Sequence, residues 1–151
     1  MFDRNLAARA GSEIVIGILF QERFRSSLEI KTEMEEEFGK VGLDSLIGLP
    51  VRLQAWNLEE VAALDSLREV DVLYITPLRA VNVEQVTAFS RKYHILTFTG
   101  VPDYMAPSSG ASVGVELKGG RPQIVINLSA AKAEGADFSS QLLKLARVVG
   151  E

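Results

Sequence analysis

Buried-strand patterns alternate with helical patterns along the first hundred residues, and this alternation constrains the fold more than any other feature of the chain. Residues 13–20 (EIVIGILF), 71–76 (DVLYIT) and 95–101 (ILTFTGV) are almost continuously apolar, which is typical of strands buried on both faces. Residues 49–56 (LPVRLQAW) alternate in part and indicate a further strand. Strands that alternate with helices predict βαβ units, right-handed crossovers and a mainly parallel sheet.

Three segments between these strands have the periodicity or the boundaries of helices. The first runs from residue 21 to about residue 40. Asn57 with Glu60, and Asn82 with Gln85, have the spacing of a capping box, so two further helices are expected to begin there and to run to about residues 69 and 93. The apolar side chains expected on one face are Phe24, Leu28, Ile30, Met34 and Phe38 in the first helix, and Val83, Val86, Phe89 and Tyr93 in the third.

The segment after residue 110 predicts a different kind of strand pairing. Residues 112–117 and 123–128 flank the pair Gly119-Gly120, and a Gly-Gly pair between two β-rich runs predicts a hairpin because a primed turn needs positive φ. Pro122 has no N–H to donate, so we expect it at a sheet edge or at the start of a strand. Residues 129–135 are expected to form a turn or a short helix.

An amphipathic helix is expected to close the fold. Asp137 is a plausible N-cap, and Phe138, Leu142, Leu145 and Val149 then lie on one helical face that packs on the sheet. We therefore predict one domain over residues 1–151 of the α/β class. Its architecture is expected to be a three-layer sandwich with a mainly parallel sheet of about six strands, a C-terminal β-hairpin and a closing C-terminal helix.

Composition excludes several kinds of protein. The 151 residues carry a net charge of -4, which argues against general nucleic-acid binding because that needs a basic face. There is no cysteine, so disulfides, thiol catalysis and thiolate metal sites are excluded. No run approaches the ~20 apolar residues of a membrane span, so direct membrane insertion is not expected. The N-terminal residues MFDRNLAARAGSE lack the features of a signal peptide.

No motif points to catalysis, a metal or a cofactor. His94 is the single histidine and is expected to lie at a helix end, where backbone carbonyls and the helix dipole explain it. The acidic run that contains Glu33 and Glu35–Glu37 spreads around a helix and is interpreted as a solvated face. Residues 110–114 match G-x-S-x-G but lack the strand before and the helix after that a nucleophile elbow needs. No phosphate-binding glycine motif is present.

A positional rule nevertheless locates a candidate binding site. In open parallel sheets, ligands and partners meet the loops at the carboxyl ends of the strands, where a small polar crevice could form. Ordinary capping and loop contacts by the same residues remain the alternative interpretation. The candidate ligand- or partner-binding residues at these ends are Phe20, Gln21, Arg23, Thr76, Arg79, Thr99, Gly100, Asp103 and Tyr104.

The C-terminal block resembles the YfiR/HmsC-like family. The matching elements are the strand that ends in Ile126-Asn127-Leu128, the pair Ala130-Ala131, and the run FSSQLLKLA from Phe138 to Ala146. Upstream strands occupy corresponding places, so the likeness covers most of the chain. The chain departs from the family in lacking cysteines and an aromatic-rich first helix. The lack of cysteines rules out redox control by disulfides.

This resemblance implies a periplasmic regulatory domain that is not an enzyme and that often forms homodimers. Characterised members restrain a membrane-bound diguanylate cyclase by binding its periplasmic part, so cyclic di-GMP signalling through an envelope protein partner is the implied role. An alternative is a small-molecule sensor that resembles one lobe of a solute-binding protein. A third is an enzyme of unrecognised type, which would need converging ionisable groups with perturbed pKa values.

Overall fold

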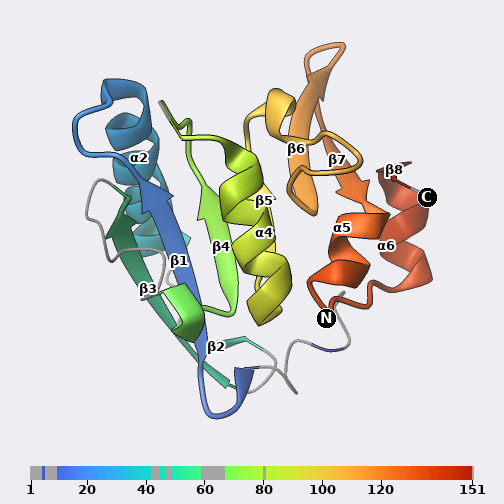
Figure 1. The fold of residues 1–151 in the computed structure, drawn as a ribbon, viewed down its shortest axis with the longest axis horizontal. Coiled ribbons are helices and arrows are strands. Elements are labelled where there is room, and N and C mark those ends of the chain that lie inside the picture. Colours follow the sequence, from blue (N-terminus) through green and yellow to red (C-terminus); the bar gives the residue numbers. More distant parts are fainter. Residues whose placement is uncertain are drawn as a thin grey trace.

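A single mixed sheet organises the chain in the computed structural model, which describes residues 5, 10–41, 45–46, 49–58, 67–79 and 81–150. The strand order is β2-β3-β1-β4-β5-β6-β7-β8, and all neighbours are parallel except β2 with β3 and β6 with β7 (Figure 1). The strands are β1 (Ile14–Phe20), β2 (Ser45–Leu46), β3 (Leu49–Asn57), β4 (Val72–Ile75), β5 (Leu96–Thr99), β6 (Val113–Lys118), β7 (Arg121–Asn127) and β8 (Arg147–Val149).

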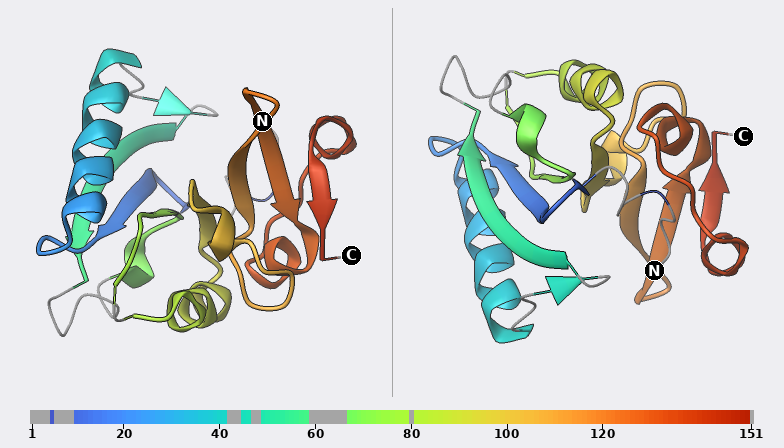
Figure 2. Two further views of the ribbon diagram at one scale, coloured as in Figure 1. Left: turned by 90° about the horizontal axis from the view of Figure 1, so that it is seen from above. Right: turned by 90° about the horizontal axis from the view of Figure 1, so that it is seen from below.

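Helices cover both faces of this sheet and make three layers. Figure 2 shows α2 and α6 on one face and α4 and α5 on the other. This arrangement confirms the predicted α/β sandwich with its parallel strands, hairpin and C-terminal helix, although the sheet has eight strands among the described residues rather than about six. The helices are α2 (Arg25–Val41), α4 (Val83–Tyr93), α5 (Leu128–Ala133) and α6 (Ser140–Leu145), with short 3₁₀ turns η1 (Leu67–Glu69) and η2 (Pro102–Tyr104).

Two hydrophobic clusters fill the space between these layers. The first lies under η1 and α4 and joins the parallel strands β1 and β4, whereas the second lies between the hairpin strands and the C-terminal helices. The first contains Val15, Leu19, Leu67, Val70, Leu73, Ile75, Val86, Ile95 and Ala111. The second contains Leu96, Val113, Ile126, Ala131, Ala136, Phe138 and Leu142. The second cluster includes Leu96 of β5, so it reaches from the C-terminal hairpin to the nearest parallel strand.

The predicted helix faces agree with the burial in part. In α4, Val86 is fully buried and packs in the first cluster with Val83, Phe89 and Tyr93, as predicted. Asn82 caps this helix as expected, and its side-chain oxygen accepts from the N–H of Glu84. The apolar side chains of α2 are only half-buried, and this helix begins at Arg25 rather than at residue 21. Most of the helix predicted after Asn57 lies outside the described residues.

The hairpin confirms the interpretation of Pro122. Gly119 and Gly120 both have positive φ, at 59° and 78°, and join β6 to β7. The Asn127 N–H donates to Ser112 O, so Val113 and Ile126 form a non-hydrogen-bonded pair. Alternation then makes Leu117 and Pro122 a non-hydrogen-bonded pair too, with the nitrogen of Pro122 on the outer side of β7. Since β8 pairs only from Val125 onward, no ladder bond is lost at the proline.

The end of the chain corrects the predicted long closing helix. Ser139, not Asp137, is the N-cap of α6, because its hydroxyl accepts from the N–H of Leu142 at 3.3 Å. The helix ends at Leu145, and residues 147–149 instead form β8, which pairs with β7. Leu145 is consequently 74% exposed rather than packed on the sheet. Residues 147–149 fit either a helical or a strand pattern by their spacing. Their pairing with the edge of β7 makes them a strand.

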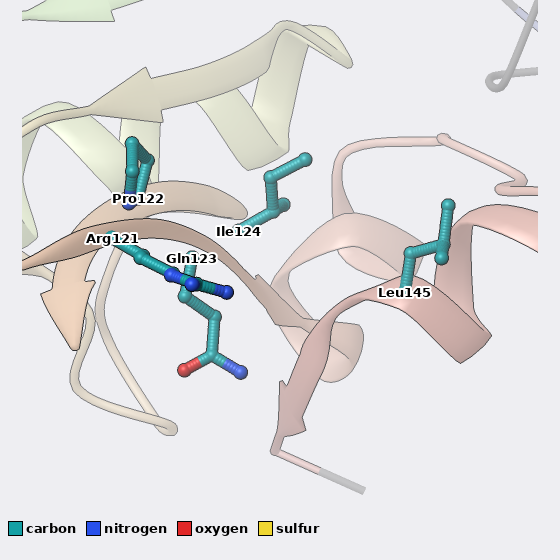
Figure 3. Close-up of a pocket in the computed structure, with 5 residues that line it drawn as sticks. All are labelled: Arg121, Pro122, Gln123, Ile124 and Leu145. Carbon is teal, nitrogen blue, oxygen red and sulfur yellow. The ribbon is translucent and has the colours of Figure 1, made fainter. Parts of the chain in front are cut away.

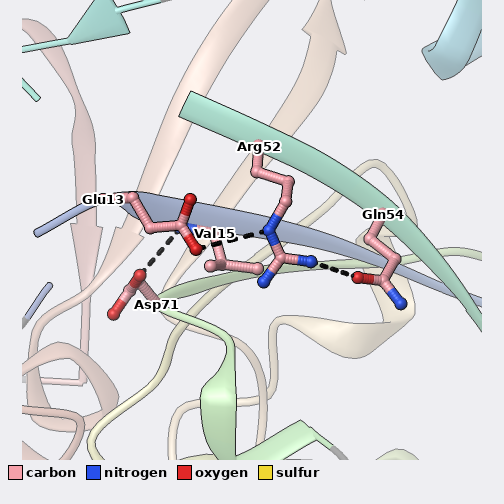
Figure 4. Close-up of polar contacts among 5 residues, drawn as sticks. All are labelled: Glu13, Val15, Arg52, Gln54 and Asp71. Atoms are coloured by element: carbon pink, nitrogen blue, oxygen red, sulfur yellow. Dashed lines mark hydrogen bonds and ion pairs between the residues drawn. The ribbon is translucent and has the colours of Figure 1, made fainter. Parts of the chain in front are cut away.

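Polar contacts fix the start of β1 to its two neighbouring strands (Figure 4). The carboxylate of Asp71 accepts from the N–H of Val15 at 2.8 Å, and Arg52 of β3 donates to Glu13 and to Gln54. The Arg52–Glu13 pair is exposed at both ends, so its contribution to stability is small. Within the described residues, no helix is both long enough and apolar enough to cross a membrane.

Candidate functional site

The first candidate residues follow β1, where Gln21 turns the chain toward α2. Gln21 is 6% exposed, and its amide makes two bonds with the backbone of Arg79. The Arg79 N–H donates to Gln21 Oε1 at 2.6 Å, and Gln21 Nε2 donates to Arg79 O at 2.9 Å. The side chain of Gln21 therefore holds the loop after β4 against the end of β1, because its amide both donates to and accepts from the backbone of Arg79.

Thr76 lies at the carboxyl end of β4 and is fully buried. Its hydroxyl donates to Leu19 O at 2.7 Å and lies 2.6 Å from Ser27 Oγ. Since the hydroxyl hydrogen of Thr76 goes to Leu19, Ser27 is the donor in the second contact. Ser27 also accepts from the N–H of Gln21 at 2.8 Å. Thr76 and Gln21 are thus joined through one serine of α2.

The loop after β5 is bound to the loop after β4 in a similar way. The Thr99 hydroxyl donates to Ile75 O at 2.9 Å and accepts from the N–H of Val101 at 3.1 Å. The phenol oxygen of Tyr104 accepts from the N–H of Leu78 at 2.8 Å and lies 3.3 Å from Leu78 O. Thr99 and Tyr104, both predicted site residues, therefore form these hydrogen bonds with backbone groups of β4 and of the loops that follow β4 and β5.

The remaining candidates supply charge and aromatic surface. The Arg79 guanidinium lies 5.2 Å from the centre of the Phe24 ring, and Lys31 Nζ lies 5.0 Å from the centre of the Phe20 ring. Arg23 and Asp103 are exposed. A side chain at Gly100 would meet the hydroxyl of Tyr74, whose pKa is raised by burial, with the nearby Glu33 adding to the shift.

The structure therefore brings Gln21, Thr76 and Arg79 into one hydrogen-bonded group, with Thr99 and Tyr104 attached to the adjoining loop. These contacts are also what the alternative interpretation, ordinary loop chemistry, describes. Among the described residues, no group of three or more acidic, histidine or cysteine side chains could hold a metal ion.

A buried acid with a raised pKa, Glu134, lies elsewhere, and the sequence interpretation did not single it out. Glu134 is 0% exposed and follows α5. It contacts Ser90 of α4, Thr97 of β5 and Ser112, which precedes β6. Burial raises the pKa of Glu134, and the hydrogen bonds from Ser112, Ser90 and Thr97 oppose that rise. The sequence around Glu134 gave no sign of a buried acid, because the side chains that contact it are distant in sequence.

A second surface feature lies at the free part of the β7 edge. Val115, Ile124 and Leu145 are 49%, 38% and 74% exposed, although each is a large apolar side chain. Val115 and Ile124 are paired across β6 and β7, and Ile124 and Leu145 line one shallow hollow of about 370 Å³ with Arg121, Pro122 and Gln123 (Figure 3). Contiguous exposed apolar side chains are typical of interaction surfaces.

The fold defines an architectural class before any family is considered: an α/β lobe with a mainly parallel sheet and helices on both faces. The chain is similar to an ABC domain from Streptococcus pneumonia determined in complex with L-Trp (TM-score 0.65, 14% identity, 96% of this chain and 60% of that chain). It is also similar to the ligand-free, open form of a substrate binding protein with adhesive properties from Clostridium difficile (TM-score 0.63, 17% identity, 96% and 57%). The chain thus spans about 60% of these structures, and at such identities the likeness concerns the fold alone.

A match to a protein family is more specific than the likeness in fold. The YfiR/HmsC-like family matches residues 7–147, nearly the whole chain, and the chain belongs to it. A search of curated protein sequences finds no match. The family is one of periplasmic regulatory proteins, and this membership supports a periplasmic regulatory domain.

Proposed function

We propose that this chain is a non-enzymatic regulatory domain of the cell envelope that binds and restrains a membrane-bound signalling protein. The observation that carries this proposal is the family match over residues 7–147. By the resemblance, the partner is the periplasmic part of a diguanylate cyclase or of a similar envelope receptor. On this proposal the chain acts in the periplasm and performs no chemistry of its own.

The exposed apolar group Val115, Ile124 and Leu145 is the surface we assign to this contact. An apolar centre with a polar rim is the usual anatomy of a protein interface. Here Arg121 and Gln123 line the hollow beside Ile124 and Leu145 and provide its polar part.

The test is direct binding by the purified chain. The periplasmic part of each membrane diguanylate cyclase of the source organism would be titrated with the wild type and with Ile124→Lys. Gln85→Lys, which adds the same charge to an exposed position on α4, is the matched control. We expect binding that Ile124→Lys weakens at least tenfold and that the control leaves unchanged. Absence of binding to every cyclase, together with unchanged cellular cyclic di-GMP after deletion, would refute the proposal.

Self-association is part of the same proposal, because the family resemblance implies a homodimer. Sedimentation equilibrium of the purified chain at high concentration measures it. A mass of twice 16.5 kDa is expected, and a strictly monomeric chain would contradict the dimer without affecting the partner proposal.

A small-molecule sensor is the second candidate function, and the likeness to a domain determined with L-Trp favours it. The ligand would meet the loops after β1, β4 and β5, at the residues predicted from the sequence. Thermal unfolding with amino acids, other metabolites and nucleotides tests it, since a ligand of the folded state raises the unfolding temperature. Constant unfolding temperatures across the set would remove this candidate.

A further inference from the structure

In the interior of the sheet, among the strands that the structure describes, the pairing between β5 and β6 is the narrow one, and we call it the seam. These strands pair at two positions only, Phe98 with Val113 and Thr99 with Gly114. The pairings on either side are longer, with four pairs between β4 and β5 and six between β6 and β7. The second hydrophobic cluster crosses this seam, since it joins Leu96 of β5 to Val113 of β6 and Ile126 of β7. Polar side-chain contacts add to this packing in holding the C-terminal part, which comprises β6 to β8 with α5 and α6, against the parallel strands.

Glu134 spans this seam with its carboxyl group. On the side of the parallel strands, Glu134 Oε1 accepts from the N–H and the hydroxyl of Thr97, both at 3.0 Å, and Oε2 lies 2.5 Å from Ser90 Oγ. On the other side, Oε1 accepts from the hydroxyl of Ser112, immediately before β6. The N–H of Ser112 in turn donates to Thr97 Oγ1 at 2.9 Å. A single buried side chain thus binds α4, β5 and the residue before β6 to the end of α5.

Counting hydrogens shows how the neutral form of the carboxyl fits this arrangement. Ser90 Oγ lies within hydrogen-bond distance of both Thr87 O, at 2.8 Å, and Glu134 Oε2, but it has only one hydrogen. If that hydrogen goes to Thr87 O, the contact with Glu134 needs a proton on Oε2. The neutral acid supplies it and satisfies all of these groups at once.

Among the residues that the structure describes, no cation faces the carboxyl of Glu134. The groups that face the carboxyl are the neutral side chains of Ser90, Thr97 and Ser112. The neighbouring cations of α4 are directed elsewhere, because Arg91 donates to the carbonyls of Ser108 and Gly110 and Lys92 lies against the Tyr93 ring. On its own segment, Lys132 is exposed. An ionised carboxylate would therefore be held in the interior by neutral donors alone.

We propose that Glu134 is a proton-dependent latch, whose neutral carboxyl closes the β5–β6 seam and whose ionisation loosens the C-terminal part from the parallel strands. The latch would make the domain respond to the acidity of its surroundings, whichever partner it binds. The raised pKa of Glu134 sets the direction of this response. A folded-state pKa above the unfolded one gives stability that is complete at low pH and is lost as pH rises through the folded pKa.

The first experiment follows opening of the seam by hydrogen exchange of the Thr97 and Ser112 amides between pH 4.5 and 8, after correction for intrinsic exchange. In the wild type, the opening equilibrium should rise by up to about tenfold per pH unit until the folded pKa is passed. Glu134→Gln, which keeps the shape of the neutral acid, should flatten this profile. Ser129→Ala, an exposed hydroxyl near the start of α5, is the control and should follow the wild type.

A second experiment needs only the unmodified chain. The side-chain carboxyl carbons of ¹³C-labelled glutamates report ionisation directly in a pH titration by NMR. One carboxyl should titrate above the range of the exposed glutamates, in step with the opening equilibrium. If every glutamate titrates in the ordinary range, or if Glu134→Gln retains the wild-type pH profile, the latch is refuted.

Discussion

Asn127 offers the sharpest test of how the C-terminal part is built. It is 0% exposed at the end of β7, and the oxygen and the nitrogen of its side-chain amide bind different segments. Oδ1 caps α5 by accepting from the N–H of Ala130 at 3.3 Å. Nδ2 donates to Ala106 O at 3.0 Å and to Pro107 O at 3.1 Å, which holds the loop before β6.

Asn127→Ala removes both functions together. Loss of an N-cap costs about 1 kcal/mol, and loss of each of two hydrogen bonds costs about 1 kcal/mol. Because Ala106 and Pro107 are exposed, water can replace part of the lost bonding at their carbonyls. We expect a loss of about 2–3 kcal/mol in the free energy of unfolding, which urea unfolding measures.

Asn127→Asp separates the two functions. Aspartate keeps the acceptor for the Ala130 N–H, but it places an anionic oxygen against two carbonyl oxygens. This variant should therefore be at least as unstable as Asn127→Ala at neutral pH. Ser129→Ala, which removes a neighbouring exposed hydroxyl, should cost under about 1 kcal/mol. The reasoning is wrong if Asn127→Ala lies within about 0.5 kcal/mol of the wild type, or if Asn127→Asp is as stable as the wild type.

Three further changes test the same region. Gly150→Ala should lower the free energy of unfolding by about 1–2 kcal/mol in urea, because Gly150 has φ of 70° and a Cβ would meet Asn127 Oδ1. Ser139→Ala should lower it by about 1 kcal/mol by removing the cap of α6, and an unchanged urea midpoint would contradict the cap. Leu145→Ser should change the unfolding temperature by under about 2 °C, since the side chain is 74% exposed, so a large fall would show that Leu145 packs after all.

Much of the fold could be predicted because its signals are local. Continuous apolar runs such as residues 14–20 indicate strands covered on both faces, and Gly119-Gly120 specifies its own turn. The end of the chain could not be predicted in the same way. Leu142, Leu145 and Val149 have helical spacing, but residues 147–149 pair with β7, and pairing between strands is not encoded by spacing. Ser139 and Asp137 are both good caps, so sequence alone does not choose between them.

The candidate site shows the same limit. Gln21, Thr76 and Arg79, which the carboxyl-end rule selected, lie together because parallel strands end at one edge, and their role as a binding site stays a prediction. It could not show that Gln21 pairs with the backbone of Arg79, since that depends on the conformation of two loops. Glu134 was missed for a similar reason, because Ser90, Thr97 and Ser112 reach it from three other elements.

The lengths of the outermost strands have a consequence for how the molecule can associate. The sheet ends in β2, of two residues, on one side and in β8, of three residues, on the other. Strands this short offer few unpaired backbone groups, and beyond β8 the nitrogen of Pro122 has no hydrogen to donate. On the β8 side, growth of the sheet by lateral addition of foreign strands is therefore disfavoured, whereas β2 covers only the first two residues of β3. Partners on the β8 side would approach through side chains on the faces of the sheet, so recognition there would depend on amino-acid identity rather than on generic backbone pairing.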